Sequence, residues 1–225
     1  MFIYQNNNKD ICINLENNRP NLLPDYALSI RDNTLVINGL PIPVMTKEII
    51  ETDYEVPVGG QVIDSPVGIY LNNATISATN DTAGDGVFHI TKNGSLTIDG
   101  QGCINGVGNN DYNMAIWADG GNVTINNGTF TNIGATSESD SAHFDLIYAK
   151  NGSVVEINGG YFECETPKWT LNSHDTNKGN FIVKGGTFYK YDPSHADTEP
   201  GGLTNFVAPG YKVIKDGDLY TVIKN

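Results

Sequence analysis

The segment INNGTF at 125–130 decides the fold, because the chain repeats it as INGGYF at 157–162 and as VKGGTF at 183–188. Four longer stretches align around it: NGSLTIDGQGCI (93–104), GGNVTINNGTF (120–130), NGSVVEINGGYF (151–162) and KGNFIVKGGTF (178–188). Each contains a glycine turn, an alternating strand, a second turn and a further strand. Self-similarity at a fixed interval predicts stacked structural repeats.

Strand alternation with a period of two places equivalent apolar residues of the repeats on one face. The expected core columns are Leu96, Val123, Val155 and Phe181, then Ile98, Ile125, Ile157 and Val183, and after the turn Ile104, Phe130, Phe162 and Phe188. The columns advance by roughly 26–32 residues, enough for three short strands and three turns per rung. The longest step contains the polar stretch 134–143, which is interpreted as an insertion.

These patterns predict an all-β chain built as a solenoid of parallel strands, a β-helix with three-strand rungs. The strand before each phrase is expected at 86–92, 113–119 and 144–150, with an upstream copy at 68–78. We expect the β-helix to span 68–209 and a capping hairpin about Asp216–Gly217 to span 210–225. Residues 46–67 are expected to be a connector, either a short helix or a strand that pairs across subunits.

Residues 1–45 lack the repeat and are expected to form a small β-rich anchor or assembly segment. Its strand candidates carry the apolar residues Ile11, Ile13, Leu28, Ile30, Leu35 and Ile37. So few residues in short strands make a marginal independent domain. Such segments commonly gain order by adding strands to a partner.

The composition excludes some functions. With 26 acidic and 13 basic residues the net charge is −13, which repels nucleic-acid phosphates and anionic lipid headgroups, and no stretch approaches the length of a membrane span. Cys12, Cys103 and Cys164 form neither a disulfide framework nor a zinc motif. The first residues do not read as a signal peptide, so we expect synthesis and folding in a reducing cytoplasm.

Catalysis is the first alternative, and we expect no enzyme and no cofactor. A polysaccharide lyase needs clustered carboxylates and a basic residue, whereas both arginines precede the β-helix and Lys92, Lys150 and Lys184 lie at turns. A hydrolase needs convergent carboxylates. The candidates are Asp99, Asp111 and Asp119, but Asp99 and Asp119 lie beside turn glycines, where aspartate is common anyway.

Histidines and aromatic residues supply the remaining candidates. His143 lies near Asp140 and Asp145, and His174 lies beside Asp175, so a metal site between loops of adjacent rungs is an alternative to the favoured interpretation of solvated side chains. His89 is expected to face outward. Trp117, Trp169 and Tyr148, together with Tyr161, are candidates for glycan contact, although packing is the more common role of such residues.

The stretch LNNATISATNDTAGDGVFHITKNGSLTIDGQGCI (71–104) resembles the right-handed parallel β-helix family, in a form similar to carbohydrate-lyase-like β-helices of gut Bacteroidetes and their phages. An anchor segment followed by an acidic solenoid resembles head fibres or capsid decoration proteins of crAss-like phages. That resemblance implies a homotrimer on the capsid exterior, bound to capsid proteins through residues 1–45, with host-surface glycan attachment as a further role. The alternatives are a bacterial cell-surface carbohydrate-binding module and a polysaccharide lyase or hydrolase.

Overall fold

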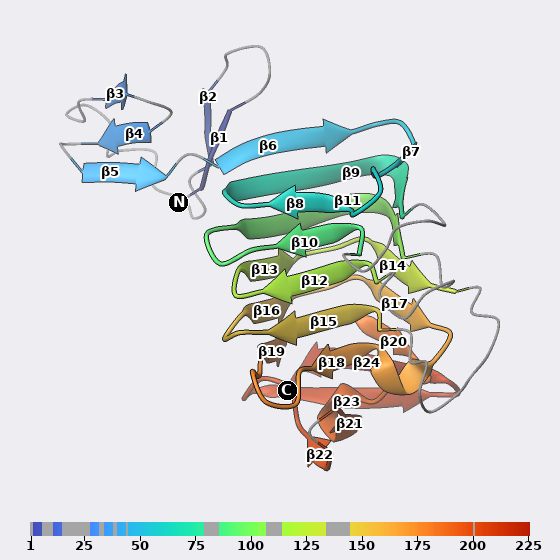
Figure 1. Ribbon diagram of the computed structural model, residues 1–225. Coiled ribbons are helices and arrows are strands. Elements are labelled where there is room, and N and C mark those ends of the chain that lie inside the picture. Colours follow the sequence, from blue (N-terminus) through green and yellow to red (C-terminus); the bar gives the residue numbers. More distant parts are fainter. Residues whose placement is uncertain are drawn as a thin grey trace.

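The structure is a computed structural model of the 225-residue chain. It describes the backbone of residues 2–5, 11–14, 28–31, 34–37, 40–43, 45–78, 86–106, 114–133, 145–199 and 201–225, and within these ranges the side chains from residue 47 onward. The described chain is nearly all β and forms a parallel β-solenoid of about 4 turns (Figure 1). No α-helix occurs in these ranges, and none of their segments forms a helix that could span a membrane.

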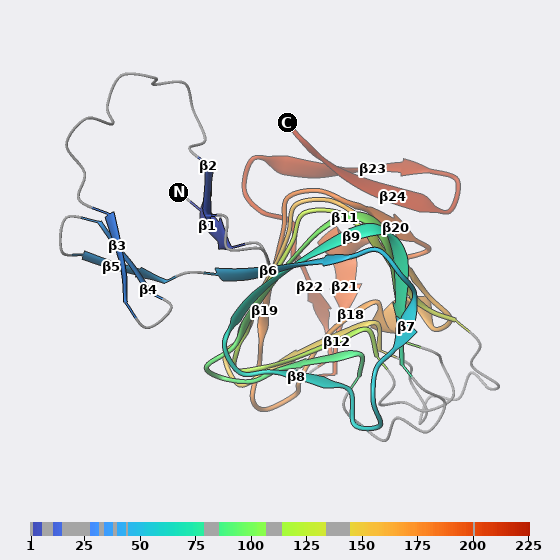
Figure 2. The same ribbon diagram turned by 90° about the horizontal axis from the view of Figure 1, so that it is seen from above.

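The solenoid has three parallel ladders of strands, and the turns superpose when viewed along the axis (Figure 2). One ladder is a five-stranded sheet of β8 (Gln61–Ile63), β10 (Phe88–Ile90), β12 (Ile116–Asp119), β15 (Ile147–Lys150) and β18 (Leu171–Ser173). The second contains β13 (Asn122–Ile125), β16 (Val154–Ile157) and β19 (Asn180–Val183), and the third β14 (Thr129–Asn132), β17 (Tyr161–Cys164) and β20 (Thr187–Tyr189). The long strands β9 (Pro66–Ser77) and β11 (Ser95–Asn105) bend at a corner, so that the first half of each belongs to the second ladder and the other half to the third.

The core consists of side chains stacked in register from rung to rung. Leu96, Val123, Val155 and Phe181 are Cα partners in successive strands, as are Ile98, Ile125, Ile157 and Val183, and as are Ile104, Phe130, Phe162 and Phe188. All twelve are buried. The rings of Phe130, Phe162 and Phe188 stack with centroid separations of 5.1 and 4.7 Å. The three columns therefore hold the rungs together by repeated apolar contact, since parallel strands lie only about 4.8 Å apart.

The turn inside the repeated phrase also stacks. Asn158 Nδ2 donates to Asn126 Oδ1 of the preceding rung at 3.1 Å, which continues the hydrogen bonding between strands through the turn. The last glycine of the turn, two residues after the Asn126 position, has a positive φ in all three copies: 116° at Gly128, 105° at Gly160 and 97° at Gly186. A side chain is disfavoured in that conformation, which explains why the phrase keeps glycine there.

The solenoid begins earlier than residue 68. β6 (Met45–Ile50) pairs in parallel with β9, β7 (Tyr54–Glu55) pairs with the second half of β9, and β8 is the first strand of the five-stranded sheet. The expected connector is thus a first rung, and its strands pair within the same chain. Its residues carry no copy of the repeated phrase, so alternation alone did not distinguish it from a linker.

From the sequence alone, residues 163–180 are expected to form an exposed loop, but the structure shows that this segment contains a further strand of the solenoid. They hold the end of β17, the 3₁₀ turn η1 (Pro167–Trp169), strand β18 and the start of β19. β18 extends the five-stranded sheet by pairing in parallel with β15. The other expected loop, 134–143, lies outside the described residues.

The N-terminal strands have antiparallel partners. β1 (Phe2–Gln5) pairs with β2 (Ile11–Asn14) and, through two residues, in parallel with β6. β3 (Leu28–Arg31), β4 (Thr34–Ile37) and β5 (Leu40–Pro43) form an antiparallel sheet of their own. Ile11 and Ile13 lie in β2, Leu28 and Ile30 in β3, and Leu35 and Ile37 in β4, as expected for strand residues; their side chains lie outside the described set.

The C-terminal end is closed by a hairpin of β23 (Tyr211–Asp216) and β24 (Leu219–Lys224), in agreement with the prediction. β24 pairs antiparallel with β20, so it covers the edge of the last rung (Figures 1 and 2). Between β20 and this hairpin lie η2 (Pro193–His195), β21 (Ala196–Asp197) and β22 (Leu203–Thr204). Capping the edge hinders end-to-end pairing of the sheet with other chains.

The two cysteines with described side chains are free thiols. Cys164 is buried in the core, and burial raises the pKa of its thiol to about 12. Burial also raises the pKa of Cys103, although its hydrogen bond with Thr131 opposes this shift. Cys164 is therefore a small core residue and Cys103 a half-buried one, and the raised pKa values predict low reactivity for both thiols.

Candidate functional site

The outward face of the five-stranded sheet gathers most of the candidate residues. His89, Trp117, Tyr148 and Asn172 are Cα partners in β10, β12, β15 and β18, so they form one column along the solenoid axis. Asp119 and Lys150 form the next column outward along the strands. We call this surface, together with His174, Asp175 and Glu199, the outer sheet face.

Trp117 lies in the middle of the column and has partners in both neighbouring rungs. The His89 ring of the preceding rung stacks on the indole with centroids 4.1 Å apart and planes inclined by 7°. The Lys150 ammonium of the following rung lies 4.3 Å from the indole centroid. Because these two contacts come from the preceding and the following rung, Trp117 links three rungs by stacking and a cation–π contact.

Asp119 links the same three rungs by charge. Its Oδ2 lies 3.4 Å from His89 Nε2 and 3.6 Å from Lys150 Nζ, and its Oδ1 accepts a 2.6 Å hydrogen bond from Asn151 Nδ2. Partial burial acts to raise the pKa of the Asp119 carboxyl, but the Asn151 hydrogen bond and the Lys150 and His89 interactions outweigh it and leave the pKa below its ordinary value. The carboxylate is therefore stabilised in its charged form by the fold.

The Asp119→Asn substitution is expected to destabilise the protein by about 0.5–1 kcal/mol at neutral pH, because solvent screens a pair whose side chains are only partly buried. The Asp119 side chain is 23% exposed. A lowered folded pKa contributes stability above the unfolded pKa, and that contribution is lost as the pH falls through the folded pKa. The free energies of unfolding of the parent and of Asp119→Asn, measured in urea, should therefore differ at pH 7 and become equal in acid. The matched control Asp64→Asn, at an exposed position, should differ little from the parent at either pH; an equal effect of both changes would contradict the assigned pairing.

A second set of contacts lies at the other end of the column. Tyr148 Oη donates to Glu199 Oε2 at 3.1 Å, and the buried Asn172 donates through Nδ2 to Glu199 Oε1 at 3.2 Å and to Asp145 Oδ1 at 2.9 Å. The Glu199 backbone N–H donates in return to Asn172 Oδ1 at 3.0 Å. Burial, followed by the charges of Glu199, Asp145 and Asp175, raises the pKa of the Tyr148 hydroxyl well above its ordinary value. These contacts hold the segment around Glu199 against the sheet.

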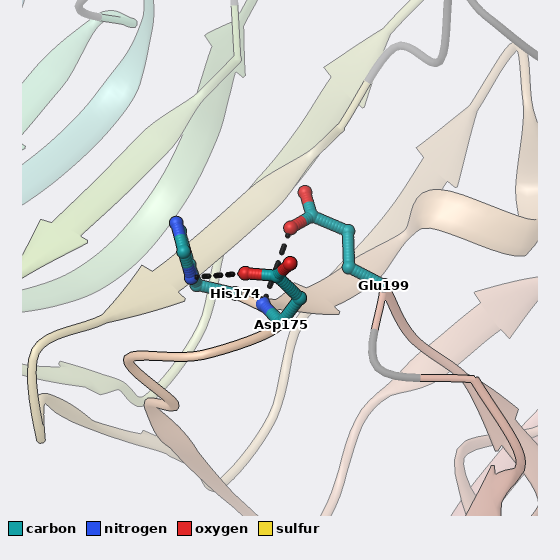
Figure 3. Close-up of side chains that lie close together, drawn as sticks. All are labelled: His174, Asp175 and Glu199. Atoms are coloured by element: carbon teal, nitrogen blue, oxygen red, sulfur yellow. Dashed lines mark hydrogen bonds and ion pairs between the residues drawn. The ribbon is translucent and has the colours of Figure 1, made fainter.

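His174 and Asp175 follow β18 directly and lie beside Glu199 (Figure 3). His174 Nδ1 is 2.9 Å from Asp175 Oδ1, and the Asp175 backbone N–H donates to Glu199 Oε2 at 3.3 Å. Ligand atoms of the three side chains all lie within 4.8 Å of one another. The structure thus brings an imidazole and two carboxylates to one point on the outer sheet face.

No protein-family model, no curated protein and no solved structure matches this chain. Fold and geometry are therefore the available grounds for its function. A β-solenoid is compatible with a structural protein and with a carbohydrate-binding β-helix.

Of the candidate catalytic aspartates, the two within the described residues, Asp99 and Asp119, do not converge. Asp99 lies in β11 on a different sheet from Asp119, and its carboxylate accepts the adjacent Gly100 N–H at 2.7 Å, as a turn residue does. Asp111, Asp140 and His143 lie outside the described residues. Lys92 is exposed, and Lys184 donates to Glu156 on the neighbouring rung at 2.7 Å, which lowers the pKa of that carboxyl.

The aromatic candidates are also divided among surfaces. Trp117 and Tyr148 share the outer sheet face, whereas Trp169 lies in η1, where the Lys168 ammonium is 4.6 Å from its ring centroid. Tyr161 lies in β17, on another sheet, and donates to Glu163 at 2.9 Å. Sequence reasoning missed Asn172 and Glu199, because β18 is short and Glu199 lies outside the repeats.

Proposed function

We propose that this protein is the structural solenoid of a virion fibre or capsid decoration, non-catalytic, homotrimeric and anchored to the capsid through residues 1–45. The observation that carries the proposal is the unbroken parallel ladder that runs from β6 to β20 with in-register buried columns. Stacked hydrogen bonds and side chains along one axis suit a stiff projecting rod.

The arrangement of the acidic residues supports a non-catalytic role. Asp119 is paired with Lys150, His89 and Asn151, and Glu199 accepts hydrogen bonds from Tyr148 and Asn172. Carboxylates in these positions brace one rung against the next. A glycosidase instead needs a pair of carboxyl groups that flank the substrate bond.

Self-association is supported by exposed apolar side chains on the first rung. Ile49, Val58 and Val62 are 52%, 67% and 56% exposed, although each is large and aliphatic. They lie on the rung that adjoins the N-terminal strands. Side-by-side packing of copies would remove these side chains from water and couple association to stability.

Host-glycan attachment is the second role that we propose, and the outer sheet face is the surface that would bind the glycan. Neighbouring strands are about 4.8 Å apart, so polar groups recur along this face at a spacing comparable to a pyranose ring. Asn151, Lys150 and Asp119 supply donors and acceptors there, while the His89 ring and the Lys150 ammonium lie against the indole of Trp117. A glycan would therefore be recognised mainly by hydrogen bonds rather than by flat stacking on the indole.

Light scattering of the full-length chain tests the fibre proposal. We expect a particle of three times the 24.3 kDa chain mass. The double change Ile49→Lys with Val62→Lys should reduce it to the monomer mass without loss of the β signal in circular dichroism, whereas the control Leu203→Lys, at an exposed position near the other end, should leave the mass unchanged. A monomer mass for the unchanged chain would contradict the fibre assignment. Absence of binding to every glycan on an array would contradict the host-attachment role and leave capsid decoration as the proposed function.

A further inference from the structure

Three ionisable side chains lie together at one end of the outer sheet face. His174 and Asp175 lie at the end of β18, and Glu199 comes from the segment after β21 that crosses beside it (Figure 3). The three ligand atoms lie within 4.8 Å of one another. The geometry points to a site for a divalent transition-metal ion, with Zn²⁺ as the reference ion, held by His174, Asp175 and Glu199.

The hydrogen bonds of His174 define its ligand atom. The backbone N–H groups of Thr176 and Asn177 donate to Nδ1 at 3.1 and 3.2 Å, so this nitrogen carries the lone pair that a metal ion would use in their place. An ion pair with Asp175 would need a proton on Nδ1, where two N–H groups already point. Asp175 Oδ1 accepts the same Thr176 N–H at 2.6 Å. The two acceptor atoms, 2.9 Å apart, share the Thr176 N–H, and a metal ion bound by both would take the place of these hydrogen bonds.

The spacing fits a metal ion. Two ligand atoms each about 2.1 Å from one ion are about 3.0 Å apart at right angles and about 3.4 Å apart at the tetrahedral angle. The His174 to Asp175 separation of 2.9 Å matches the first value. The limit of 4.8 Å for the three ligand atoms exceeds both values, so the Glu199 carboxylate has to move toward His174 and Asp175 when the ion binds.

Glu199 is also held by buried polar groups, as metal-binding carboxylates are. Its two oxygens accept from Tyr148 and from Asn172, and Asn172, which is fully buried, is fixed in turn by the buried Asp145. Such supporting hydrogen bonds orient ligands and commonly alter metal affinity by tenfold or more when removed. Asp145, Asp175 and Glu199 all act on Tyr148 electrostatically, so negative charge converges at this point. This supports a cation, and the imidazole favours a transition metal over Ca²⁺ or Mg²⁺.

A bound ion would join the end of β18 to the segment after β21 and so fasten the last rung to the chain that leads to the cap. An ion that binds only the folded chain stabilises it in proportion to its concentration. This inference does not depend on the virion proposal, because it concerns one chain and its own side chains.

Zn²⁺ titration of the tag-free, EDTA-treated full-length protein by calorimetry tests the site. We expect one saturable ion per chain and a melting temperature that rises with Zn²⁺. His174→Gln and Asp175→Asn, both on partly or largely exposed side chains, should each weaken binding at least tenfold and abolish the thermal shift.

The matched control is His195→Gln. His195 also lies 3.4 Å from an aspartate, Asp192, but belongs to no three-residue cluster among the described residues. It should bind Zn²⁺ as the parent does. Absence of saturable binding, unchanged affinity in His174→Gln and Asp175→Asn, or an equal loss in His195→Gln would each overturn the proposed site.

Discussion

Replacement of Phe162 by alanine is expected to lower the free energy of unfolding by about 3–5 kcal/mol, the usual cost of removing a large buried ring. Phe162 is fully buried and stacks between Phe130 and Phe188, at 5.1 and 4.7 Å between ring centroids. Its loss therefore leaves a cavity that weakens contacts to both neighbouring rungs. Urea unfolding followed by circular dichroism measures the change, and the melting temperature should fall by about 10 °C or more.

The matched control is Tyr161→Phe at the adjacent position. Tyr161 lies on the outer surface of the same strand and loses only its hydrogen bond to Glu163. We expect a change of about 1 kcal/mol or less. If Phe162→Ala cost no more than Tyr161→Phe, the ring column could not be the core of the solenoid.

Gly100→Ala is expected to be similarly severe, at about 3–5 kcal/mol, because it combines backbone strain with overpacking. Gly100 has a φ of 94°, and a Cβ there would overlap the backbone carbonyl oxygen of Leu71, its partner on the preceding rung. The rungs would have to separate locally, at the corner where β11 bends. Soluble yield and thermal unfolding should both fall.

Gly152→Ala separates strain from crowding. Gly152 also has a positive φ, 76°, but a Cβ there would meet no atom within 4 Å. We expect a cost of only about 1–2 kcal/mol from the left-handed conformation. Equal effects at the two glycines would show that the rungs do not approach each other as closely at Gly100 as the structure has them.

The parts of the fold that are built from the repeated phrase could be predicted from the sequence. The apolar columns such as Leu96 and Val123 were visible because both the strand period and the rung interval recur. Strand β6 was not recognised, because it contains no copy of the repeated phrase and its pairing with β9 is a long-range contact. β18 was missed for a related reason: its three residues follow a proline-containing turn and include one aliphatic side chain, Leu171.

The candidate site was less predictable than the fold. Adjacent placement of His174 and Asp175 was evident in the sequence, but Glu199 reaches them from a segment with no repeat pattern. The partnership of Trp117 with His89 and Lys150 depends on the alignment of three rungs. Side chains on an outward face have no burial constraint that would reveal such register in the sequence.

The most direct test of the central claim is disulfide cross-linking between rungs, in a chain whose three native cysteines are replaced by alanine. Thr124 and Glu156 are Cα partners on adjacent parallel strands, so the pair Thr124→Cys with Glu156→Cys should oxidise readily, because such strands are about 4.8 Å apart. Thr97 lies one rung further from Glu156, and the pair Thr97→Cys with Glu156→Cys should stay reduced at about 9.6 Å. Peptide mass spectrometry distinguishes the two. A link in the first pair alone is the result that in-register parallel stacking predicts; no link there, or a link between 97 and 156, would contradict it.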